Sequence, residues 1–164
     1  MRPKDLQTLF KQIINEGAAS RRDLTMMAIT HLCDLLLFES KATGETDVWE
    51  EAKILIEQLD VQAQEQQLFF IMVDALILRA KCAAVEGKLS QALKYYDEAQ
   101  VIASEKKLGL WIQKVFVERK RFEEEFEKWR TLIQQNASLQ ERLKQARMED
   151  YLQEVQKMLT LMKE

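Results

Sequence analysis

Residues 73–106, VDALILRAKCAAVEGKLSQALKYYDEAQVIASEK, decide the fold of this 164-residue chain. Two runs with helical apolar spacing meet there at a single glycine, Gly87. The run before the glycine is apolar on nearly every face. The run after it keeps its apolar residues on one stripe, at spacings typical of a half-exposed helix: Leu89, Ala92, Leu93, Tyr96, Ala99 and Ala103. The stretch therefore predicts a central helix, a tight turn and a second, antiparallel helix.

The composition of the whole chain predicts an all-α fold. Four glycines and one proline are too few for a protein of many strands, while 47% hydrophobic residues suffice for one substantial core. We therefore expect a single helical domain over residues 1–164 with about seven helices. Its parts are an N-terminal helix in 1–19, a divergent helix pair in 20–60, the clear pair in 61–108 and a long hairpin in 109–164.

Charge, hydropathy and cysteine usage exclude several classes of function. A net charge of −3 gives no general attraction to nucleic acid or to anionic membranes. The longest apolar stretch, residues 68–78, is shorter than the roughly 20 residues that span a bilayer. Cys33 and Cys82 lack the companions of a metal or redox motif, and no signal peptide is visible. We expect a cytoplasmic protein without cofactor, metal, nucleic acid or membrane.

The C-terminal third predicts two long helices. Residues 110–135 contain no helix breaker, so they predict one helix roughly 40 Å long. Asn136-Ala-Ser138 ends it, and Ser138 with Glu141 has the spacing of a capping box. Because so short a link returns the chain, the last helix is expected to fold back antiparallel.

The central stretch resembles a tetratricopeptide repeat, a helix-turn-helix unit of 34 residues. The resemblance lies in small residues where the two helices cross, in the turn and in one aromatic residue: Ala80, Gly87, Ala92, Ala99 and Tyr96. The terminal proline of the repeat is absent, and Lys114 stands where a following repeat would have a small residue. Residues 129–143 also resemble the C-terminal ends of archaeal tetratricopeptide-repeat proteins.

The resemblance implies a concave face that binds an extended or helical peptide. The first helix of the clear pair would line it with Asp74, Ile77, Leu78, Lys81 and Ala84, and the divergent pair would add Thr30, His31 and Asp34. A carboxylate within FFIMVDALIL is costly to bury unless it faces a groove or is paired. The alternative for Asp74 is an ion pair with a Lys or Arg of a neighbouring helix.

The long hairpin predicts a homodimer. Its far end projects beyond the shorter helices of the array, so its aromatic and methionine side chains need cover from each other, a second copy or a partner. The candidates for this surface are Phe122, Phe126, Trp129, Tyr151, Met158 and Met162.

Two functional hypotheses follow. The first is a non-enzymatic scaffold that binds a protein or peptide in its groove, within a larger regulatory assembly. The second is a self-associating structural domain whose groove is filled by its own N-terminal helix. A third class, an enzyme using His31 and Asp34, has no support from the common phosphate-loop, nucleophile-elbow or zinc motifs.

Overall fold

A computed structural model describes residues 3–17 and 22–146, and within these ranges every regular element is a helix. The predicted all-α class is confirmed. Tyr151, Met158 and Met162 lie outside the described residues. By its contacts the chain divides into two compact units, with the boundary between Leu55 and Ile56.

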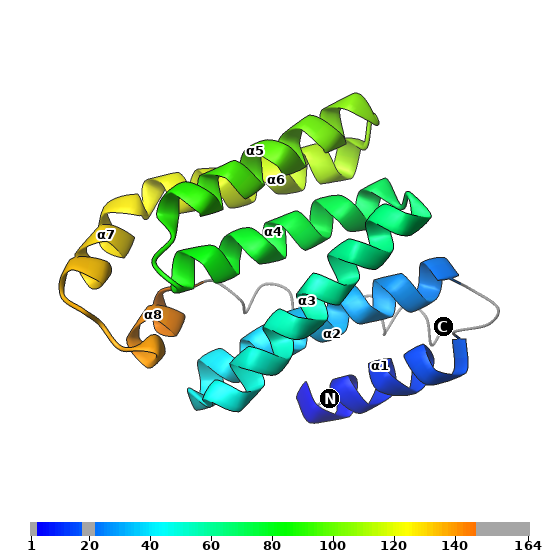
Figure 1. Ribbon diagram of the computed structural model, residues 1–164, viewed down its shortest axis with the longest axis horizontal. Coiled ribbons are helices and arrows are strands. Elements are labelled where there is room, and N and C mark those ends of the chain that lie inside the picture. The colour runs from blue at the N-terminus through cyan, green and yellow to red at the C-terminus, as the bar shows by residue number, and fades with distance from the viewer. Residues whose placement is uncertain (1–2, 18–21, 147–164) are drawn as a thin grey trace. The chain divides into compact units, whose positions relative to one another are not determined.

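The first unit contains α1 (Pro3–Gly17), α2 (Arg22–Thr43) and the beginning of α3 (Thr46–Gln66). Helix α1 packs along α2 (Figure 1), with Leu6 and Phe10 buried on the amphipathic face that the sequence predicts. The Gln7 amide donates a hydrogen bond of 2.6 Å to Glu39 Oε2. Within α2 the buried Ser40 hydroxyl donates to the Leu36 carbonyl of the same helix at 2.8 Å, which satisfies a polar group in the core.

The second unit holds the end of α3 and five further helices. These are α4 (Phe69–Val85), α5 (Leu89–Glu105), α6 (Gly109–Glu124), α7 (Phe126–Gln134) and α8 (Leu139–Gln145). Helices α4 and α5 make the most extensive contact, and α6 packs beside both of them (Figure 1). Ala80, Ala92 and Ala99 are fully buried, so the predicted small residues do allow the close approach of α4 and α5.

Four turns of the second unit share one geometry. At Gln67, Gly87, Lys107 and Asn136 the backbone is left-handed, with φ between 53° and 82°. In each turn this residue and the next donate to carbonyls three and five positions back, as from Gly87 to Ala84 and from Lys88 to Ala83. This is the Schellman motif, which satisfies the last carbonyls of a helix. As a result α4, α5 and α6 begin 20 residues apart.

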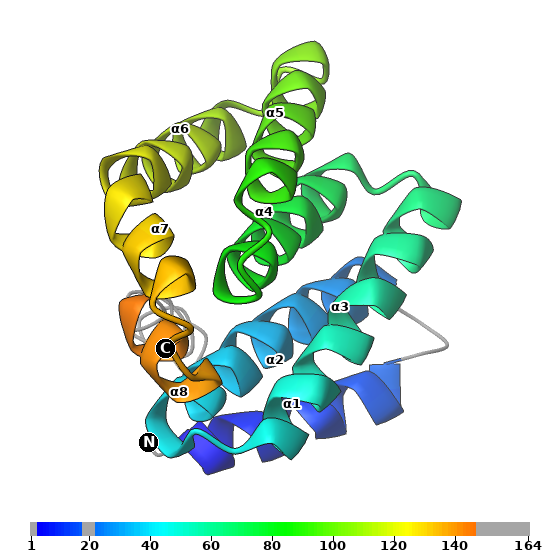
Figure 2. The ribbon, with the colours of Figure 1, turned by 60° about the vertical axis from the view of Figure 1, so that its left-hand side comes forward.

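The prediction of one unbroken helix over residues 110–135 is wrong. Helix α6 ends at Glu124 and α7 begins at Phe126, with Glu125 at φ −97° and ψ 3° between them. Figure 2 shows the sharp bend between the two helices. The bend keeps the aromatic residues on the inside, where Phe126 meets Phe122 edge-on with a centroid distance of 5.8 Å.

Helices α7 and α8 contact the C-terminal end of α4. Arg142 on α8 donates to the Val85 carbonyl at 2.6 Å, at the negative end of the α4 dipole. Ile133 on α7 lies against Gly87, where an added Cβ would come within 3.4 Å of it. Of the predicted capping box at the start of α8, the structure shows the Ser138 half, since Ser138 Oγ accepts from the Glu141 amide at 3.2 Å.

Candidate interaction surface

The predicted groove residues of α4 are buried. Ile77, Leu78 and Ala84 have less than 4% of their surface exposed, and Asp74 and Lys81 have 9% and 8%. A helix with so little exposed surface offers no groove wall to a peptide. The apolar three belong to the core of the second unit.

Asp74 and Lys81 meet α6 instead. Asp74 Oδ1 lies 2.8 Å from Lys114 Nζ, and Lys81 Nζ lies 3.5 Å from Glu118 Oε2. For Asp74 the structure therefore shows the alternative expected from the sequence, an ion pair with a lysine of a neighbouring helix. We call these two pairs the α4–α6 seam.

The order of charges in the α4–α6 seam selects one register. Helices α4 and α6 run in the same direction, because each joins the antiparallel α5 through a tight turn. Along α4 the charges are negative and then positive, and along α6 they are positive and then negative. Sliding α6 by one turn would bring Glu118 toward Asp74, and like charges in a largely buried setting are destabilising. The seam thus explains why α4 tolerates two charges within an apolar run.

Tyr96 closes the adjoining contact between α5 and α6. It is 3% exposed, and its ring lies 5.7 Å from that of Phe122. Burial raises the pKa of the Tyr96 hydroxyl well above its usual range, and the carboxylates of Glu118 and Glu125 raise it further. The phenol therefore stays neutral inside the unit.

Thr30, His31 and Asp34 lie on α2, in the first unit, and not with Asp74 and Lys81. The Thr30 hydroxyl donates to the Met26 carbonyl of its own helix at 2.9 Å. The His31 ring stacks on Phe10 of α1 at a centroid distance of 5.6 Å, and Asp34 is buried. These contacts are those of a helix packed in a core.

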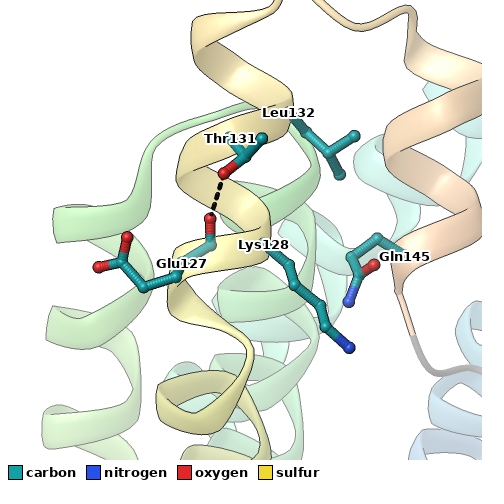
Figure 3. Close-up of a pocket in the computed structure, with 5 residues that line it drawn as sticks. All are labelled: Glu127, Lys128, Thr131, Leu132 and Gln145. Atoms are coloured by element: carbon teal, nitrogen blue, oxygen red, sulfur yellow. Dashed lines mark hydrogen bonds between the residues drawn. The ribbon is translucent and has the colours of Figure 1, made fainter.

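A pocket of about 390 Å³ lies between α7 and α8. Figure 3 shows its lining residues, which are Glu127, Lys128, Thr131, Leu132 and Gln145. It is open to solvent. Thr131 donates to the Glu127 carbonyl of its own helix at 2.9 Å, and the Glu127 carboxylate lies 3.1 Å from Arg130. Thr131 and Glu127 therefore have partners on α7 itself, and the Gln145 amide donates to Glu125 Oε2 at 3.2 Å.

The described part of the predicted dimer surface points inward. Phe122 and Trp129 are 5% and 4% exposed, and Phe126 is half-buried against Phe122. These aromatic residues hold α6 and α7 within the unit rather than presenting a face to a second copy. The bend at Glu125 is what allows them to do so.

The exposed apolar surface lies on the other side of α6. Leu110 is 76% exposed, Phe116 64%, Val117 44% and Ile112 37%. We call these four residues the outer face of α6. Ile112 and Phe116 lie one helical turn apart, and Leu110 and Val117 lie two turns apart, so the four residues form two stripes on either side of Gln113. The sequence pattern did not predict this face. It directed the predicted interface to the aromatic residues Phe122, Phe126 and Trp129 instead.

No family model, curated protein or solved structure matches this chain. Among the residues that the structure describes, no helix is both long and apolar enough to cross a membrane. Within 3–17 and 22–146, no group of three or more His, Cys, Asp and Glu side chains is arranged to hold a metal ion.

Two positions on α4 that are equivalent to residues of the outer face of α6 are buried. A shift of 40 residues, the spacing between the starts of α4 and α6, relates Phe116 and Val117 to Leu76 and Ile77. Leu76 and Ile77 are 5% and 1% exposed. In an array of packed helices such a side is covered by the next helix. Among the residues that the structure describes, the outer face of α6 is therefore the exposed end of the helical array.

Proposed function

We propose that this chain is a non-enzymatic protein-interaction module whose binding surface is the outer face of α6. The observation that carries the proposal is a group of large apolar side chains, Leu110, Phe116 and Val117, exposed on one helix. Clustered exposed apolar residues are typical of interaction sites, whereas scattered ones are ordinary.

The position of Asp74 and Lys81 in the α4–α6 seam favours this surface over the groove expected from the tetratricopeptide resemblance. A peptide that used these two residues as anchors would have to break both pairs with α6. The resemblance itself stays a prediction, and α6 begins 40 residues after α4, whereas a tetratricopeptide repeat recurs after 34. We place the module in the cytoplasm, since Cys33 and Cys82 are both buried free thiols.

Affinity purification from the native host, with quantitative mass spectrometry, tests the proposal. We expect Phe116→Asp to lower the recovery of specifically bound protein, including untagged copies of the chain, by about tenfold or more, because burial of a Phe side chain contributes about 1.5–3 kcal/mol. The matched control is Val61→Asp, which changes a 50% exposed valine on α3. Equal recovery with Phe116→Asp and Val61→Asp, both folded by circular dichroism, would refute the proposal.

A further inference from the structure

We draw no further inference here: the strongest candidate, the exposed apolar patch on the outer face of α6, belongs to the binding surface already proposed, and nothing in the described part of the chain shows what covers it.

Discussion

Tyr96 makes the stability of the second unit depend on pH. Its neutral phenol is buried beside Glu118 and Glu125, which raises its pKa in the folded state above the unfolded value of about 10. The stabilisation is complete below that pH. Above it the unfolded state loses the proton first, so we expect stability to fall as the pH rises.

Urea unfolding from about two pH units below to about one and a half above the unfolded tyrosine pKa of about 10 measures this effect. Tyr96→Phe should flatten the alkaline fall. Tyr95→Phe is the matched control, because the Tyr95 ring is half-buried under Arg79 at 5.5 Å. Identical slopes for Tyr96→Phe and the unmodified chain would show that the phenol contributes nothing to the pH dependence.

Asp74 and Lys114 should be coupled energetically. Asp74→Asn removes a charge from a pair 2.8 Å apart, and we expect it to lower the free energy of unfolding by about 1–3 kcal/mol. Lys114 is more exposed, so Lys114→Met should have a smaller effect. A double-mutant cycle in urea should give a coupling of about 0.5–2 kcal/mol. Strict additivity would mean that the pair does not stabilise the seam.

At the scale of elements, two glycines in adjoining turns should respond oppositely to alanine. Gly87 has φ 82° and faces Ile133, so Gly87→Ala should destabilise the fold by about 1–2 kcal/mol. Gly109 is the first residue of α6 and has open space around its Cα, so Gly109→Ala should stabilise by up to about 1 kcal/mol. Thermal unfolding of the two variants distinguishes them. A Gly87→Ala variant as stable as the unmodified chain would contradict the left-handed turn.

Apolar periodicity predicted the elements with strong patterns and missed those set by backbone conformation. The helix pair around Gly87 was predictable because a glycine marks its turn and small residues mark its crossing. The boundary between residues 108 and 109 was predicted as well, but the left-handed residue of its turn was not, since Lys107 with φ 55° carries no glycine or asparagine signal. The bend at Glu125 was hidden for a similar reason. No breaker marks it, and it accompanies the contact of Arg142 with the Val85 carbonyl, which is far away in the sequence.

The candidate site was less predictable than the fold. Periodicity identified α4 as central but not whether Asp74 faces a groove or a neighbouring helix, because that depends on where α6 lies. In the sequence, the outer face of α6 was visible only as three apolar residues, Leu110, Phe116 and Val117, in the same helix as Phe122. Their exposure depends on which side of α6 packs on α4 and α5, and the sequence pattern alone does not determine that side.

At the scale of the whole molecule, α6 has two separate roles. Its inner side joins α4 through the α4–α6 seam and α5 through Tyr96 and Phe122. Its outer face ends the array with large apolar side chains. A variant on the outer face should therefore change association while leaving stability nearly unchanged, whereas a variant in the seam should do the reverse.

Paired capture experiments on Phe116 and Val61 test the central claim most directly, because both side chains are exposed but only Phe116 belongs to the outer face of α6. We predict that Phe116→Asp lowers the recovery of specifically bound protein about tenfold or more, while Val61→Asp leaves it unchanged. Equal recovery by the two folded variants would contradict the claim that the outer face of α6 is the binding surface.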